Sequence, residues 1–147
     1  LLQWQLFKLM ISNYDSHAKN VSFFWGRNSC SFTPGYDLVN VAMFPQFKQA
    51  LAMAVGDEFE PDHIHAYQLA DFAESCGLKR PLVAQSLREL SAKVLHVIST
   101  QDLSKELEQQ KLISAEEKDY IAQLIEHIKA RTLHLQKCAN NIADVTL

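Results

Sequence analysis

Hydrophobic side chains dominate the first twelve residues of the chain. In "LLQWQLFKLMI", leucine, methionine, isoleucine and aromatic residues recur at helical spacing and cover most of a helix surface. A helix that is apolar on nearly all sides is typical of a buried element. We therefore expect residues 1–12 to form a helix inside the fold.

Two short β-prone runs, residues 21–25 and 30–33, follow this helix. Four residues separate them, a connection length that is common in hairpins, and Pro34-Gly35 ends the second run. The pattern predicts an antiparallel β-ribbon over residues 21–33. We expect the aromatic side chains near this junction to belong to the core; they are Trp4, Phe7, Phe23, Phe24 and Trp25.

Helical periodicity returns in the second half of the chain and extends over residues 62–140. Gly77 is a natural C-cap, and Ser114 with Glu117 forms a capping-box pattern that opens a long helix. The predicted helices cover residues 64–75, 81–99 and 114–138, with a short polar helix or loop at 102–110. The predicted fold class is therefore mainly α with one small β-hairpin, and residues 1–147 are expected to form a single domain.

Composition and net charge indicate which kinds of molecule the chain is not built to bind. The 147 residues are 48% hydrophobic, enough for a core, and the net charge of −3 provides no general attraction for nucleic acid or an anionic membrane. No apolar stretch approaches the length of a spanning helix. Three widely spaced cysteines fit reduced, buried thiols better than a disulfide framework. We expect a cytoplasmic protein with no direct DNA binding by this chain and no membrane contact.

A cluster of polar side chains follows the first helix, in the loop "NYDSHAKN" at residues 13–20. Phosphoryl transfer needs a carboxylate that orients the attacking hydroxyl and oxygen ligands that hold Mg²⁺ against the phosphates of ATP. Asp15 and Asn20 have the spacing of the aspartate and asparagine in the catalytic loop of protein kinases. Because a tight ribbon carries the chain out and back, Asp37 in "YDL" (residues 36–38) should return to the same place.

At these residues the chain resembles the HipA family of bacterial serine/threonine kinase toxins, whose catalytic loop runs Asn-x-Asp-x-His-x-Lys-Asn. The resemblance implies that Asp15 is the catalytic base and that Asn20 and Asp37 bind Mg²⁺. It also implies that His17 and Lys19 support the loop or the γ-phosphate. The chain would then be the helical C-lobe of a HipA-like kinase.

The same resemblance implies the substrate and partners of the whole protein. Such a kinase transfers the γ-phosphate of Mg·ATP to a protein serine, with an aminoacyl-tRNA synthetase as the family's typical target, and is neutralised by a HipB-like DNA-binding antitoxin. The four glycines are too far apart for a phosphate-covering loop, and the sequence begins with Leu1 rather than Met. We therefore expect an N-terminal kinase lobe to complete the active site, and the fragment alone to be inactive.

Several residues also have structural interpretations. Asp15 and Asn20 suit turn positions, His17 suits a hydrogen bond within the loop, and Lys19 suits the surface. In this alternative the chain is a noncatalytic helical domain that binds a protein partner.

Histidines elsewhere in the chain do not predict a metal site. His63 and His65 are two residues apart and do not share a helix face, and the sequence shows no third ligand at zinc spacing. We expect His127 and His134 to lie on the solvated side of the last helix.

Overall fold

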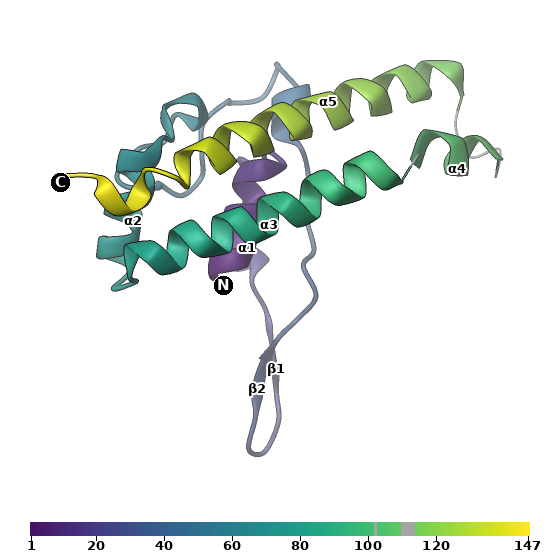
Figure 1. The fold of residues 1–147 in the computed structure, drawn as a ribbon. Helices are drawn as coiled ribbons and strands as arrows, with labels where there is room; N and C mark the ends of the chain where they lie inside the picture. Colours follow the sequence, from purple (N-terminus) through teal and green to yellow (C-terminus); the bar gives the residue numbers. More distant parts are fainter. Residues whose placement is uncertain (102, 110–113) are drawn as a thin grey trace.

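The computed structural model describes residues 1–101, 103–109 and 114–147, and its elements follow the predicted order (Figure 1). The helices are α1 (Leu2–Met10), α2 (Ala66–Ser75), α3 (Arg80–Thr100), α4 (Leu103–Gln109) and α5 (Ala115–Cys138), and the strands are β1 (Phe23–Trp25) and β2 (Cys30–Phe32). Short 3₁₀ helices cover Ala18–Asn20, Val41–Met43, Pro61–His63 and Ile142–Asp144. The predicted fold class, mainly α with one hairpin, is confirmed. Of the predicted polar segment, residues 102 and 110 lie outside the described part of the chain.

The long helices α3 and α5 run antiparallel and side by side, and α1 packs against both of them (Figure 1). The predicted capping box opens α5, because Ser114 Oγ accepts from the N–H of Glu117 and the Glu117 carboxylate accepts from the N–H of Ser114. None of the helices among the described residues has both the length and the apolar character needed to cross a bilayer.

The core forms where α1, α2, α3 and the C-terminal end of α5 meet. As predicted, α1 buries its apolar side chains here, with Leu6 and Met10 fully inaccessible to solvent. Each fully buried side chain of this size contributes about 1.5–3 kcal/mol to folding. The largest fully buried apolar side chains are Leu6, Met10, Val55, Ile64, Leu69, Val83, Leu87, Leu135 and Ile142. The core therefore holds the C-terminal end of α1 in a fixed position.

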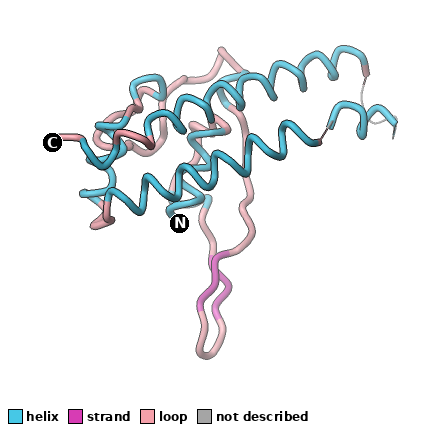
Figure 2. Tube along the Cα trace, in the orientation of Figure 1, coloured by secondary structure: helices cyan, strands magenta, loops and turns pink. Residues whose placement is uncertain are grey.

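The hairpin projects away from the helical body, as both views of the chain trace show (Figures 1 and 2). Phe23 pairs with Phe32 at the base of the ribbon. Here the ring centre of Trp4, on α1, lies 6.3 Å from that of Phe32. Among the described residues, this is the one contact between aromatic rings of α1 and the ribbon. Farther out, Phe24 is 61% exposed and Trp25 is 86% exposed. The expectation that the strand aromatics belong to the core is wrong, because the described residues provide no second layer that covers the ribbon.

The prediction that the three cysteines are buried is only partly right. Cys138 is buried, but Cys30 and Cys76 are exposed. Cys30 lies in the projecting hairpin opposite Trp25, and Cys76 caps the end of α2, so neither position faces the core.

Two glycines adopt the left-handed backbone conformation, which is uncommon for other residues. Gly77 has φ +65° and ends α2, where its N–H donates to the carbonyl of Glu74 and the next N–H donates to Ala73. Gly56 has φ +58° in the turn between Val55 and Glu58. A Cβ atom at Gly56 would lie 2.3 Å from the backbone oxygen of Gln68, whereas a Cβ atom at Gly77 would meet nothing within 4 Å.

This difference predicts unequal effects for two matched substitutions. Gly77→Ala should lower the free energy of unfolding by about 1–2 kcal/mol, the penalty of the left-handed backbone alone. Gly56→Ala should lower it by clearly more, because the new methyl group also collides with the backbone of α2. Urea denaturation of both variants measures the difference, and equal losses would show that the turn at Gly56 can move away from α2.

Candidate functional site

The chain makes a sharp turn directly after α1, at Ser12. This buried residue has φ +54°, a left-handed conformation that is uncommon for a residue other than glycine. Its Oγ lies 2.8 Å from Nε2 of His127 on α5, and its carbonyl accepts from the N–H of Val41 at 3.0 Å. Contacts from two distant segments therefore hold the turn that begins the polar loop.

Asp37 returns from the hairpin to the polar loop, as the sequence predicts. Asn13 Nδ2 donates to the Asp37 carbonyl at 2.8 Å, and Asn20 Nδ2 donates to Asp37 Oδ2 at 2.5 Å. The backbone of Asp37 is left-handed, with φ +55°. Both ends of loop 13–20 are thus bonded to the residue that follows the ribbon.

His17 and Asn20 cap the 3₁₀ helix Ala18–Asn20 reciprocally. Asn20 Oδ1 accepts from the N–H of His17 at 2.8 Å, and His17 Nδ1 accepts from the N–H of Lys19 at 3.3 Å. These bonds orient the Asn20 amide so that its nitrogen faces Asp37. In the structure the His17 imidazole therefore supports the loop, while the Lys19 side chain is exposed.

A cavity of about 530 Å³ lies beside the loop, and Asp15 and Asp37 both line it. Asp15 is exposed and has no hydrogen-bond partner within the described residues, so its carboxylate is open to solvent and to the cavity. The remaining lining is mostly apolar; the full set is Asn13, Tyr14, Asp15, Asp37, Val39, Val41, Phe44, Phe47, Lys48 and Ala50. His17, Lys19 and Asn20 lie outside this lining. An apolar cavity with a few converging polar groups is typical of a small-molecule site.

Asn20 and Asp37 offer the donor atoms that Mg²⁺ prefers. The second carboxylate oxygen of Asp37 has no bonding partner among the described side chains and backbone groups, and Asn20 Oδ1 accepts only the His17 N–H there. Mg²⁺ is held by hard oxygen ligands such as carboxylates, amide carbonyls and phosphates. The two residues therefore carry the donor types that the resemblance implies for Mg²⁺, and in this structure Asn20 turns its Nδ2 rather than its Oδ1 toward Asp37.

Sequence reasoning missed Lys8, a buried lysine beneath the loop. Its side chain is almost inaccessible, its Nζ donates to the Ser16 carbonyl at 3.1 Å, and the ammonium lies 3.8 Å from the ring centre of Trp4. Burial lowers the pKa of Lys8 to about 8. A single charge within the apolar run "LFKLM" was the signal available in the sequence. Lys48, which lines the cavity, lacked any such signal.

The predictions for His127 and His134 are wrong, because α5 packs its histidine-bearing face against other segments. His127 contacts Ser12, and burial, with a smaller effect of Arg131, lowers the pKa of this imidazole. His134 Nε2 lies 2.9 Å from the carbonyl of Ile64. Both side chains are half-buried rather than solvated.

Comparison with known proteins gives matches in sequence. Residues 1–98 match the family model described as the HipA-like C-terminal domain. The chain is 46% identical over 99 residues to the serine/threonine-protein kinase toxin HipA of Shewanella oneidensis, covering 67% of this chain and 23% of that protein. It is 29% identical over 90 residues to a candidate kinase, Y4mE, of Sinorhizobium fredii, covering 61% of this chain and 21% of that protein. The matched regions cover less than a quarter of the length of these curated relatives.

A solved structure matches nearly the whole fold. HipA of Shewanella oneidensis, determined in a complex with HipB and operator DNA, superposes with a TM-score of 0.82 at 34% sequence identity. The match covers 99% of this chain and 33% of the HipA chain. The similarity therefore extends beyond residue 98, through the long helices α3 and α5.

The buried lysine predicts a distinctive pH dependence of stability. Between the folded pKa of about 8 and the ordinary value of 10.5, the unfolded chain binds more protons at Lys8 than the folded chain does. The free energy of unfolding of the wild type should therefore rise with pH in this window, by at most about 1.4 kcal/mol per pH unit, relative to Lys8→Met. Below this pH window Lys8 is protonated in both the folded and the unfolded chain. The difference in the free energy of unfolding between the wild type and Lys8→Met should then be constant.

Urea denaturation of both proteins at about pH 7, 9 and 10 tests this expectation. The exposed Lys93→Met variant on α3 is the control and should keep the wild-type profile. Parallel profiles for the wild type and Lys8→Met would show that the Lys8 ammonium is not held in a dehydrated site.

Proposed function

Because the chain belongs to the HipA-like C-terminal domain family, we propose that it forms the catalytic-loop region of a serine/threonine protein kinase. One observation carries this proposal: Asp37 is bonded to both Asn13 and Asn20 and lines the same cavity as Asp15. Protein kinases need this combination, in which one aspartate faces the attacking hydroxyl while an asparagine and a second aspartate hold metal.

In this proposal, Asp15 is the catalytic base. Its exposed carboxylate accepts the proton of the attacking serine hydroxyl and orients the oxygen toward the γ-phosphate.

Asn20 and Asp37 would hold Mg²⁺, which, when bound, neutralises charge on the phosphate oxygens of ATP. His17 keeps Asn20 in place through the reciprocal cap. Lys19 is exposed at the same turn, and we propose that it contacts the γ-phosphate. The existing bond between Asn20 and Asp37 supports a shared role, because it keeps the two side chains together before any ion binds.

A kinase also needs a phosphate-covering loop, which we place outside these 147 residues. The glycines at 26, 35, 56 and 77 provide no phosphate-covering loop, and the relatives are more than four times the length of the matched region. We propose that an N-terminal kinase lobe supplies the phosphate clamp, and that these 147 residues alone are inactive.

The same comparison supports one partner. The solved HipA was determined with HipB and operator DNA, which supports a HipB-like DNA-binding antitoxin as a partner here. We further propose a serine on another protein as substrate, with an aminoacyl-tRNA synthetase as the first candidate.

Substitutions of the two aspartates test the proposed roles. In a protein of the relatives' full length that contains these residues, Asp15→Asn should lower the rate of phosphate transfer by about 10²- to 10⁴-fold. Asp37→Asn should also abolish transfer, and raising the Mg²⁺ concentration should restore part of it only in this variant. The measurement is transfer of labelled γ-phosphate from ATP to protein, with circular dichroism as the check on folding.

Asp57→Asn is the matched control. Asp57 shares the left-handed backbone conformation of Asp37, with φ +57°, but it lies outside the cavity lining. This variant should keep full activity. Undiminished transfer by Asp15→Asn would overturn the proposal and favour a noncatalytic interaction domain.

A further inference from the structure

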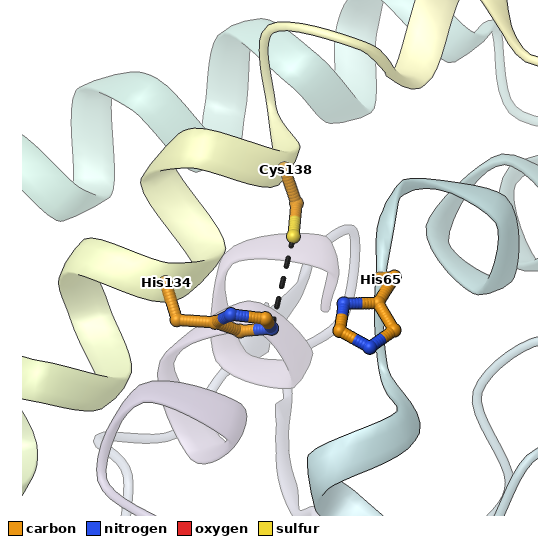
Figure 3. A group of neighbouring side chains, drawn as sticks. All are labelled: His65, His134 and Cys138. Atoms are coloured by element: carbon orange, nitrogen blue, oxygen red, sulfur yellow. Dashed lines mark hydrogen bonds between the residues drawn. The ribbon is translucent and has the colours of Figure 1, made fainter.

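Three side chains with metal-ligating atoms meet where the segment before α2 crosses the C-terminal end of α5. They are His65, His134 and Cys138, and one ligand atom from each lies within 4.8 Å of the other two. The Cys138 sulfur points at the edge of the His134 ring that carries Nε2, and His65 lies beside the same edge (Figure 3). None of these residues takes part in the kinase site proposed above.

The ligand atoms of the two residues on α5 already have nearly the separation that zinc requires. His134 and Cys138 are four residues apart on α5, so both side chains lie on one face of the helix. With Zn–S and Zn–N bonds of about 2.3 and 2.0–2.1 Å, tetrahedral geometry places sulfur and nitrogen roughly 3.6 Å apart. Cys138 Sγ and His134 Nε2 lie 3.8 Å apart. An ion could therefore bridge them with little movement of α5.

His65 supplies the third ligand from outside α5. Its ring centre lies 5.0 Å from that of His134, in an edge-on arrangement. The side chain is exposed, whereas Cys138 is buried, so the cluster is open to solvent on one side only. An ion can enter from the His65 side and reach the sulfur.

We propose that His65, His134 and Cys138 bind one zinc ion, with a water molecule as the fourth ligand. Thiolate and imidazole ligands favour zinc over the hard cations Mg²⁺ and Ca²⁺, which prefer oxygen. The cluster thus differs in chemistry from the oxygen ligands at Asn20 and Asp37. Its failure in the test below would leave the kinase proposal unaffected.

Binding requires two local changes. The Cys138 thiol releases its proton to solvent and binds as thiolate; burial raises its pKa, while the positive charge of Arg131 opposes this effect. In the structure the His134 Nε2–H donates to the Ile64 carbonyl, so on binding the ring proton moves to Nδ1, and Nε2 gives up this contact and donates its freed lone pair to the ion. The ring remains neutral, and the net product is one proton released for each ion bound.

The ion would join segments that are far apart in the sequence. His65 precedes α2, while His134 and Cys138 end α5, beyond the residues that match the family model. Because the unfolded chain does not hold the three ligands together, the ion binds the folded state preferentially and stabilises it. The site is therefore a structural clamp rather than part of the catalytic machinery.

Titration of the full chain with Co²⁺ and Zn²⁺ tests the proposal under reducing conditions. Cobalt should produce a thiolate-to-metal charge-transfer band that saturates at one ion per chain and disappears when Zn²⁺ is added. Zn²⁺ should also raise the melting temperature. Cys138→Ser should lose the band, and His65→Asn should weaken binding at least about tenfold while keeping a good N-cap for α2.

Three matched variants are the controls. Cys30→Ser and Cys76→Ser replace the exposed cysteines, and His63→Asn replaces an exposed histidine two residues from His65. All three should bind cobalt as the wild type does. A folded wild type without the thiolate band, or a band that survives in Cys138→Ser, would overturn the proposal. Because His65 is exposed, its variant remains informative if Cys138→Ser does not fold.

Discussion

Buried polar groups at the C-terminal end of α1 need hydrogen-bond partners, and the shape of the loop that follows depends on this requirement. Lys8 bonds to the carbonyl of Ser16, Ser12 to His127, and Asn13 to the carbonyl of Asp37. An unpaired buried polar group costs about 1–3 kcal/mol, a large share of a domain's total stability. Any conformation of the loop that broke these bonds would therefore be strongly disfavoured.

The same bonds connect the loop to parts of the chain that are remote in sequence. His127 lies on α5, and Val41, whose N–H bonds to the Ser12 carbonyl, follows the hairpin. The left-handed backbones of Ser12 and Asp37 lie within this network, which offsets their conformational strain. The helical body thus fixes the position of Asp37 relative to Asp15, while the projecting ribbon only carries the chain out and back.

Hard and soft ligands occupy separate regions of the fold. The exposed Asp37 carboxylate lines the cavity, and the buried Asn20 amide is bonded to it through Nδ2. Sulfur and imidazole gather at the junction of α2 with α5, next to the core. The two sites proposed above would therefore take different ions, because hard cations prefer oxygen ligands and zinc accepts sulfur and imidazole.

The sequence by itself determined the helices, the hairpin and the loop motif, because periodicity, caps and turn residues are local properties. Ser114 and Glu117 cap α5 as expected. Only the tertiary structure decided which faces of these elements are covered. Trp25 is exposed because the described chain provides no second layer over the hairpin. His134 is half-buried because α5 packs against the segment before α2. The meeting of His65 with Cys138 depends on that packing, and residues that are remote in sequence give no local signal of contact.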